Sequence, residues 1–192
     1  TVAPLLVKMG FRDLNEETAF FRKPKSEARI FILGFSWTAS SLLEEIQRHA
    51  PSLLPEVLVI DFNPAVNREL KRRQIAGVYG DITQKETLLH MGVGDAEIIV
   101  CTIPNTLLKG MNNLRLLQLL RELNQTARII MHAELFEDVP KLYAAGADYV
   151  SVPRLIEAQD LCSVIDAVRK NLLHEKRRQL DEELAGRKEV IP

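Results

Sequence analysis

The sequence predicts an α/β protein with a doubly wound, Rossmann-like parallel sheet of six strands and a C-terminal helical crossover segment. Two observations predict this fold. Short apolar runs rich in β-branched residues alternate with helical patterns from residue 28 to residue 153, and the first run ends in a glycine turn. Several runs are apolar without alternation, as in parallel strands that helices cover on both faces. Right-handed crossovers then favour the strand order 3-2-1-4-5-6.

Turn and capping residues mark where the expected elements begin and end. Asn63 precedes Pro64 as an N-cap residue before a first-turn proline. A leucine-rich helix is expected over residues 107–123, and another over residues 137–144 ahead of Gly146. The expected strands lie between such segments, at Arg29–Leu33, Val57–Ile60, Gly77–Tyr79, Glu97–Thr102, Arg128–His132 and Tyr149–Val152.

Composition narrows the function classes. At 192 residues and 46% hydrophobic content, the chain suits one domain with an appendage. A formal charge of −1 argues against a general nucleic-acid-binding protein. Cys101 and Cys162 lack the spacing of a metal or redox site, and both are expected to be buried packing residues. No run of about 18 apolar residues occurs that would span a membrane.

Three regions follow from these patterns. Residues 1–27 are expected to be a leader or linker, either packed on the surface or continuing from a preceding transmembrane region. Residues 28–153 form the expected nucleotide-binding domain. Residues 154–192 are helical without further strands, and they carry an apolar stripe from Leu161 to Leu172. This segment either packs on its own sheet or leaves the domain to pack on a partner subunit.

The glycine turn is the first candidate for ligand binding. Gly34, Phe35, Ser36, Trp37 and Thr38 follow the first strand and open a helix, where free amides and the helix dipole favour an anion. Ser36 stands where the dinucleotide fingerprint has its second glycine, which lets the backbone approach a pyrophosphate. Its side chain crowds that approach, although its hydroxyl could donate to a phosphate oxygen. The alternative is that Gly34 only makes the turn.

The second and third strands end in further candidates. Asp61, followed by Phe62 and Asn63, ends the second strand, where a carboxylate accepts the ribose hydroxyls of an adenosine. A carboxylate there repels a 2′-phosphate, so NAD or an adenine mononucleotide is preferred over NADP. Asp61 could instead be a solvated strand end or a helix cap. After the third strand, in Gly80-Asp81-Ile82, Asp81 either caps the next helix or lies at the rim of an adenine pocket.

The ends of the fourth and fifth strands carry few residues that could act in catalysis or bind a metal. Thr102 and Ile103 follow the fourth strand and place backbone beside the expected cofactor crevice, and His132 ends the fifth. A lone histidine is more often a packing or surface residue than a catalyst, and its spacing matches no zinc pattern. No Ser/His/Asp order, paired carboxylates or activated cysteine stands out. The sequence therefore predicts neither a catalytic residue nor a metal site.

Six segments in series carry a family resemblance across residues 28–167. They are Arg29–Gly34, Val59–Asp61, Val78–Ile82, Met91–Thr102, Asn113–Leu116 and Leu142–Val150. The Gly80-Asp81 pair and the Gly146-Ala147-Asp148 triplet are more specific than the glycine turn. With these residues, the chain resembles the KTN/RCK (TrkA-N) family, the nucleotide-binding regulatory domains of potassium channels, potassium uptake systems and cation/proton antiporters.

The resemblance implies a cytosolic regulatory domain of an inner or plasma membrane protein. Such a domain binds NAD(H), AMP, ADP or ATP and transmits ligand state to its own transmembrane transport domain. It also implies a homodimer through the C-terminal helix, with phosphate at the glycine turn, ribose at Asp61 and the nucleoside near Asp81.

The chain departs from the family pattern at Ser36, Trp37 and His132. The residues that follow Pro153 in this sequence show no βαββ pattern of a second ligand domain, so the resemblance is expected to be closer to the antiporter branch than to the channel branch. Two other functions stay open. One is a small NAD-dependent oxidoreductase with His132 as its acid or base, and the other is a dimerisation module that binds no ligand.

Overall fold

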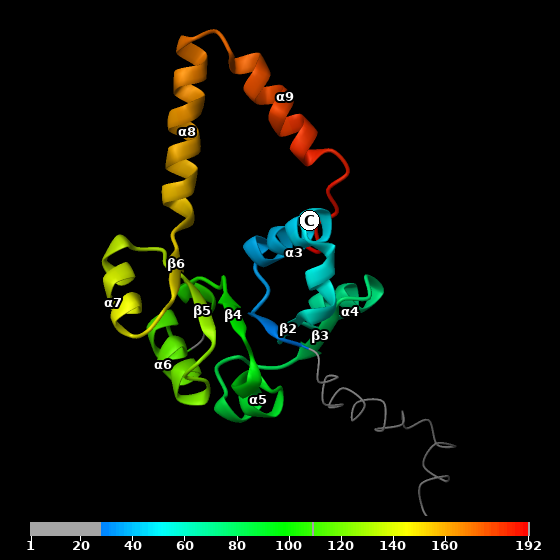
Figure 1. Cartoon of the computed structure of the whole chain (residues 1–192), viewed down its shortest axis with the longest axis vertical. Coiled ribbons are helices and arrows are strands. Elements are labelled where there is room, and N and C mark those ends of the chain that lie inside the picture. Colours follow the sequence, from blue (N-terminus) through cyan, green and yellow to red (C-terminus); the bar gives the residue numbers. More distant parts are fainter. Residues whose placement is uncertain (1–27, 109, 192) are drawn as a thin grey trace, which may run out of the picture.

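The computed structural model describes residues 28–108 and 110–191, so the expected leader over residues 1–27 lies outside the described residues. The described part forms a six-stranded parallel sheet with helices on both faces, which confirms the predicted fold class, and a helical arm projects from it (Figure 1). The strands are β1 (Ile30–Leu33), β2 (Val57–Asp61), β3 (Ala76–Tyr79), β4 (Ile98–Cys101), β5 (Arg128–His132) and β6 (Tyr149–Ser151).

Helices follow every strand along the chain. The α-helices are α3 (Trp37–His49), α4 (Pro64–Arg72), α5 (Lys85–His90), α6 (Asn113–Leu123), α7 (Val139–Ala144), α8 (Pro153–Arg169) and α9 (Leu173–Leu184). Short 3-10 turns join them at η2 (Pro51–Glu56), η3 (Val93–Asp95), η4 (Asn105–Leu107) and η5 (Phe136–Asp138). The strand order is β3-β2-β1-β4-β5-β6, as predicted from right-handed crossovers.

Two of the differences from the expected element boundaries bear on the candidate site. The helix expected from residue 107 begins only at Asn113, because the side chain of Asn112 caps it by accepting a hydrogen bond from the backbone N–H of Arg115 (2.9 Å). The fourth strand ends at Cys101, which leaves Thr102 in the loop beyond the strand. Both differences lie at the carboxyl edge of the sheet, where the expected site residues gather.

Alternate residues of the central strands face the two helical layers. Ile32 and Val59 belong to the core cluster that includes Leu43 of α3 and Leu70 of α4. The neighbouring residues of the same strands, such as Leu33, belong to the larger cluster beneath α5, α6 and α7. Helices therefore cover both faces of β1 and β2, which explains why these strands lack polar alternation.

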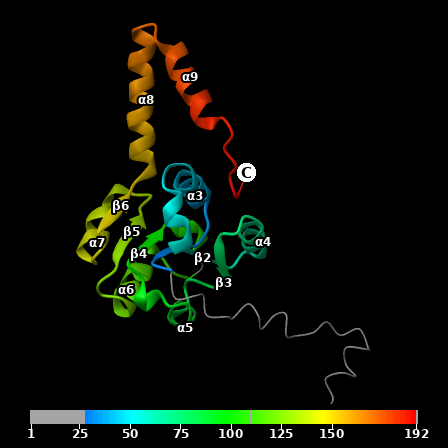
Figure 2. The same ribbon diagram turned by 45° about the vertical axis from the view of Figure 1, so that its right-hand side comes forward.

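On the α3 side, helices cover only part of the sheet, and the strands beyond its middle are exposed. Val59, Ile32, Val100, Ile130 and Tyr149 form one row of paired residues from β2 to β6. The first two are fully buried, Val100 is nearly so, Ile130 is half-buried and Tyr149 is 55% exposed. The row becomes exposed because α8, which follows β6, does not fold back over the sheet (Figure 2).

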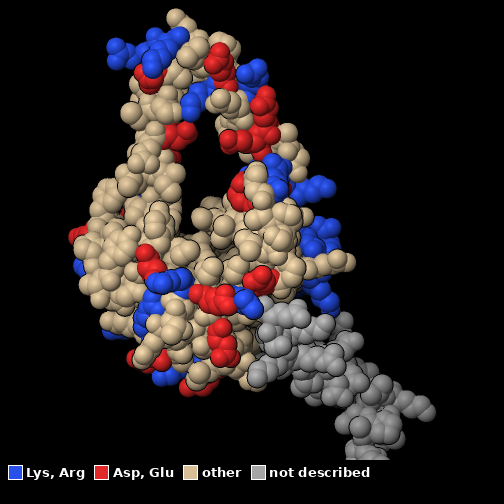
Figure 3. Space-filling model, viewed as in Figure 1, with Lys and Arg blue, Asp and Glu red and all other residues tan. Residues whose placement is uncertain are grey.

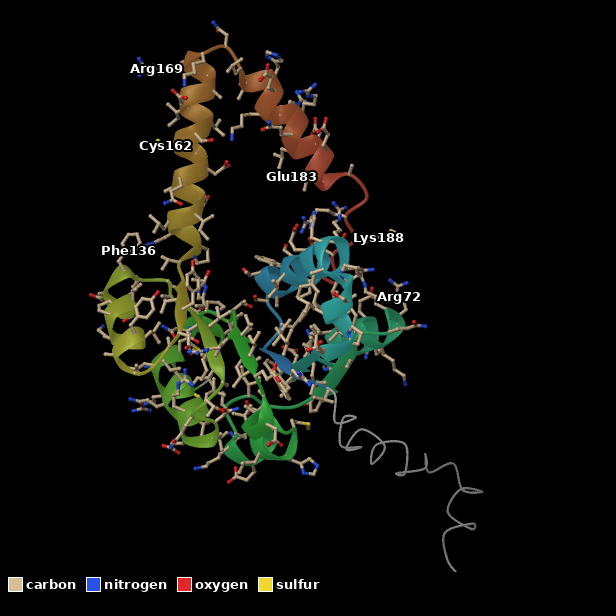
Figure 4. The ribbon with its side chains drawn as sticks, viewed as in Figure 1. Arg72, Phe136, Cys162, Arg169, Glu183 and Lys188 are labelled. Atoms are coloured by element: carbon tan, nitrogen blue, oxygen red, sulfur yellow. The ribbon has the colours of Figure 1, made fainter. Side chains whose placement is uncertain are left out.

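Helix α8 instead leaves the domain, and α9 returns toward α3, so that the two helices form an arm. The space-filling view shows the opening that this arm encloses with the body of the domain (Figure 3). Of the two readings of the C-terminal segment, the structure therefore favours a helix that leaves its own sheet. The prediction that Cys162 is buried is wrong, since it lies midway along the projecting α8 and is exposed (Figure 4). Cys101 is buried, as expected.

The Gly146-Ala147-Asp148 triplet fixes the start of β6 through hydrogen bonds and ion pairs. Gly146 has φ of +98°, and its carbonyl accepts two hydrogen bonds from Arg121. The Asp148 carboxylate accepts from the backbone N–H of Ile129 (2.9 Å) and pairs with Arg121 and Arg128, and these donors lower its pKa to about 2. The most specific motif in the sequence is thus a structural link between α6, β5 and β6.

Residues 185–191, which we name the C-terminal strap, tie the end of the arm to the domain. Arg48 of α3 donates to the carbonyls of Glu183 and Ala185, and Arg73 after α4 donates to those of Lys188 and Glu189. Figure 4 shows Lys188 beside α3. The arm is therefore anchored at both ends, once through β6 and once through the strap.

Ser40 is the buried centre of the strap contact. Its hydroxyl donates to the Glu189 carboxylate (2.8 Å) and accepts from the backbone N–H groups of Val190 (2.8 Å) and Ile191 (3.0 Å). The Val190 side chain is buried in the core cluster beneath α3 and α4. The strap therefore combines an apolar anchor with a satisfied polar network.

Replacing Ser40 by alanine is expected to release the strap. The variant leaves the buried amide of Val190 and the half-buried amide of Ile191 without their acceptor, so their hydrogen exchange should accelerate roughly tenfold or more. Ser41→Ala is the matched control, since the Ser41 hydroxyl also contacts Glu189 but is exposed (3.3 Å). Equal protection of residues 190 and 191 in both variants, measured by hydrogen-exchange mass spectrometry, would contradict this role for Ser40.

Candidate functional site

The glycine turn has the backbone that the sequence predicts, but its surroundings are filled by apolar side chains. Gly34 has φ of +71°, and a Cβ at this position would lie 2.2 Å from Cγ1 of Ile103 and 3.3 Å from Cδ1 of Ile82. Both isoleucines are buried. Glycine is required here by backbone conformation and by the close packing of Ile103, whether or not a phosphate binds.

Ser36 is the N-cap of α3 and also a bridge to the loop after β4. Its hydroxyl oxygen accepts a hydrogen bond from the backbone N–H of Ala39 (3.2 Å). The same oxygen lies 2.6 Å from Oγ1 of Thr102, so the two hydroxyls share a hydrogen bond. Because β1 and β4 are adjacent in the sheet, this bond joins the two loops on either side of the point where the strand order reverses.

Asp61 ends β2, as the sequence predicts, but its carboxylate already accepts hydrogen bonds from two backbone N–H groups. Oδ2 accepts from the N–H of Phe35 (2.7 Å), and Oδ1 accepts from the N–H of Asn63 (2.7 Å). The residue is only 4% exposed, and burial raises the pKa of the carboxyl, an effect that the two backbone donors oppose. Asp61 therefore holds the ends of β1 and β2 together. A ribose would reach its carboxylate only by displacing the residues that bury it and the two backbone donors.

The first turn of α3 nevertheless keeps donors for an anion. Among the described residues, none accepts a hydrogen bond from the backbone N–H groups of Trp37 and Thr38, and both side chains are exposed. Free amides at the start of a 13-residue helix suit a phosphate group. This part of the site fits the nucleotide that the sequence predicts, whereas the buried Asp61 fits a ribose less well.

Three exposed aromatic side chains stand at the carboxyl ends of the first three strands. Trp37 after β1 is 75% exposed, Phe62 after β2 is 56% exposed, and Tyr79 at the end of β3 is 50% exposed. Parallel strands end at the same edge of a sheet, so these rings lie on one rim of the molecule. Tyr79 was not among the site residues predicted from the sequence, although its position at the end of the third strand was an available signal.

The residues after β3 have structural roles. A Cβ on Gly80 would lie 2.8 Å from Cγ2 of Thr87 in α5, so glycine is needed for close packing. The exposed Asp81 accepts hydrogen bonds from the N–H (2.9 Å) and hydroxyl (2.7 Å) of Thr83, which stabilises the turn before α5. Ile82 packs in the core against the glycine turn.

His132 lies apart from the glycine turn, two strands from β1. It lines a separate cavity of about 150 Å³ together with Asn105, Asn113 and Lys141. Burial lowers the pKa of His132, and the nearby Glu134 carboxylate opposes that shift. The structure therefore divides the expected site residues into two places, with Gly34 to Asp81 on one side of β4 and His132 on the other.

The described ranges, 28–108 and 110–191, lack two further kinds of feature. No three His, Cys, Asp or Glu side chains in these ranges are grouped so that they could hold a metal ion. No helix there is long and apolar enough to cross a membrane.

Comparison with known proteins gives a family and a set of related folds. The family model of the TrkA-N domain matches residues 30–153. The TrkA-N domain of inner membrane protein ybaL from Escherichia coli is 20% identical with a TM-score of 0.63, over 73% of this chain and 98% of that one. Among curated proteins, no sequence matches this chain closely enough to count as a relative.

Structures of the GsuK channel are also similar. The GsuK channel is 27% identical with a TM-score of 0.61, over 78% of this chain and 25% of that chain, so this chain spans about a quarter of the channel subunit. GsuK bound to ADP is 27% identical with a TM-score of 0.56, over 76% of this chain and 35% of that one. GsuK bound to NAD is 20% identical with a TM-score of 0.53, over 78% and 27%.

Replacing Asp61 by asparagine is expected to destabilise the domain. The asparagine NH₂ group would face one of the two backbone donors that the carboxylate now accepts, which costs about 2 kcal/mol of unfolding free energy. Asp81→Asn is the matched control, because its side-chain oxygen still accepts from the N–H of Thr83. Urea denaturation of both variants measures the difference, and equal stability would show that the Asp61 contacts are not needed.

Proposed function

The chain belongs to the TrkA-N domain family, and from this premise we propose that it is the ligand-sensing regulatory domain of a cation transporter. Residues 28–153 bind an adenine nucleotide or NAD(H), residues 154–192 form the dimerisation segment, and a membrane transport domain is the partner. The domain works on the cytosolic side of that membrane and controls transport in a potassium channel or a cation/proton antiporter. A sensor of this kind needs two arrangements with different affinities for its ligand, and it needs no catalytic group.

The observation that carries the nucleotide proposal is the pair of free amides in the first turn of α3. They stand at the edge of the sheet where α/β proteins bind ligands, beside the exposed rings of Trp37, Phe62 and Tyr79. Backbone amides suit a phosphate, and exposed rings suit a base. The structures of GsuK with ADP and with NAD support a nucleotide as the ligand class.

A ligand-free dimerisation module is the second candidate. It is favoured by the Asp61 carboxylate, which already accepts two backbone N–H groups and is almost fully buried. In this alternative, the turn, its N-cap and the carboxylate only hold β1 and β2 in place. A measurement of nucleotide binding distinguishes the two functions, because only the sensor binds a nucleotide.

The proposed function predicts that AMP, ADP or NADH binds to the 192-residue chain in isothermal titration calorimetry. Trp37→Pro removes one of the two free amides at a helix position that accepts proline, and Ser36 before it already has extended backbone. Trp37→Ala is the matched control, because it removes the ring but keeps the amide. We expect Trp37→Pro to bind roughly tenfold more weakly than Trp37→Ala.

Two results would contradict the proposal. If no nucleotide binds, the chain is the ligand-free module. If Trp37→Pro and Trp37→Ala bind equally well, the phosphate does not contact the first turn of α3.

Dimerisation is proposed from two apolar surfaces that the chain leaves uncovered. Helix α8 exposes Leu161, Ile165 and Val168. The sheet row ends in the half-buried Ile130 and the exposed Tyr149. Exposed apolar area of this extent on a projecting helix is typical of a subunit interface. A second copy of the chain would cover both surfaces by the same two-fold contact.

Ile165→Glu is expected to convert the dimer to a monomer. Ile165 is 64% exposed in the single chain, so the substitution costs little folding stability but places a charge in the proposed interface. Gln159→Glu, which places the same charge at an exposed position on the opposite face of the helix, is the control and should leave the dimer intact. Sedimentation velocity measures the mass of each variant, and a wild-type chain that is monomeric at high micromolar concentration would overturn the dimer.

A further inference from the structure

The crevice between β1 and β4 is closed by side chains of this chain. A dinucleotide in a doubly wound sheet crosses this crevice, with one half beside β1 to β3 and the other half beside β4 and β5. Here the Ser36 and Thr102 hydroxyls join across it at 2.6 Å. The buried side chains of Ile103 and Ile82 lie against Gly34, 2.2 Å and 3.3 Å from where a Cβ on this glycine would be.

The two halves of the carboxyl edge are also unequal. On the β1 to β3 side stand the free amides of Trp37 and Thr38 and the exposed rings of Phe62 and Tyr79. On the β5 side, the cavity beside His132 measures about 150 Å³, against the roughly 300 Å³ or more that bound small ligands usually occupy. One half therefore offers contacts for a phosphate and a base, and the other offers little room.

From this geometry we propose that the site accepts an adenine mononucleotide and excludes a dinucleotide, with Ser36 as the residue that closes the crossing. The inference rests on the proposed nucleotide-binding function and specifies its ligand. The phosphate of an AMP or ADP lies on the first turn of α3, and the base lies on the aromatic rim. The second nucleoside of NAD has no path, because the Ser36 side chain stands where its pyrophosphate would cross.

Trp37 provides a direct reading of occupancy, because it is the only tryptophan in the chain and lies beside the proposed phosphate position. Its fluorescence is titrated with ADP and with NAD⁺ in the 192-residue chain. We expect NAD⁺ to bind at least about tenfold more weakly than ADP. Calorimetry with the same two compounds is the independent check, because the nucleotides absorb light and can lower the measured fluorescence without binding.

Ser36→Gly tests the cause of the discrimination. Glycine is an acceptable N-cap residue, so the start of α3 is expected to stay in place. The variant should bring the NAD⁺ affinity to within about threefold of the ADP affinity. Ser36→Ala is the matched control, because it also loses the bond to Thr102 but keeps the Cβ in the crossing, and it should retain most of the difference.

The outcomes separate this inference from the proposed function. Preference for ADP that Ser36→Gly removes supports both. Equal affinity of the wild-type chain for ADP and NAD⁺ overturns the inference and leaves the nucleotide site intact. A preference that Ser36→Gly leaves unchanged overturns the role of Ser36. Absence of binding by either compound overturns the proposed function, and the inference falls with it.

Discussion

The buried carboxylate of Asp61 is the interaction on which the candidate site depends. Its two oxygens accept the backbone N–H groups of Phe35 and Asn63, and these residues begin the loops after β1 and β2. The position of both loops is therefore set by one side chain. A buried charge is costly unless it is hydrogen-bonded, so the arrangement is stable only while both donors stay in place. This contact therefore fixes the backbone at Phe35 in the glycine turn before α3 and at Asn63, the N-cap of α4.

Local patterns were sufficient to predict much of the fold. Gly34 at φ of +71° and Asn63 as a side-chain N-cap both follow from rules that act within a few residues. The expectation that Asp81 caps the next helix was wrong, because α5 begins after Gln84 and Asp81 instead stabilises the turn before it through Thr83. The strand order was also predictable, because crossover handedness leaves few choices for alternating strands and helices. These features need no knowledge of which distant residues meet.

The contacts that decide ligand binding were not predictable in this way. The bond between Ser36 and Thr102 joins residues 66 positions apart, and the packing of Ile103 over Gly34 depends on the path of a loop. Whether Asp61 faces solvent or backbone depends on the same loops, so the carboxylate pattern alone could not distinguish a ribose ligand from a structural one. Cys162 was misassigned for a related reason, since an apolar stripe does not reveal whether its own domain covers it.

Helix α3 is the element that connects the candidate site to the arm. Its first turn carries the free amides of Trp37 and Thr38, and its next turns carry Ser40 and Arg48, which hold the strap. A ligand can influence a distant element only if it binds two arrangements of the shared element with different affinity. Here the shared element is helix α3, whose 13 residues carry both the free amides and the side chains that contact the strap. The polar network around Ser40 is satisfied in only one position of the strap, so a displaced α3 would leave buried amides without acceptors. A ligand at the turn would therefore reach the arm through the hydrogen bonds that Ser40 and Arg48 make to the strap.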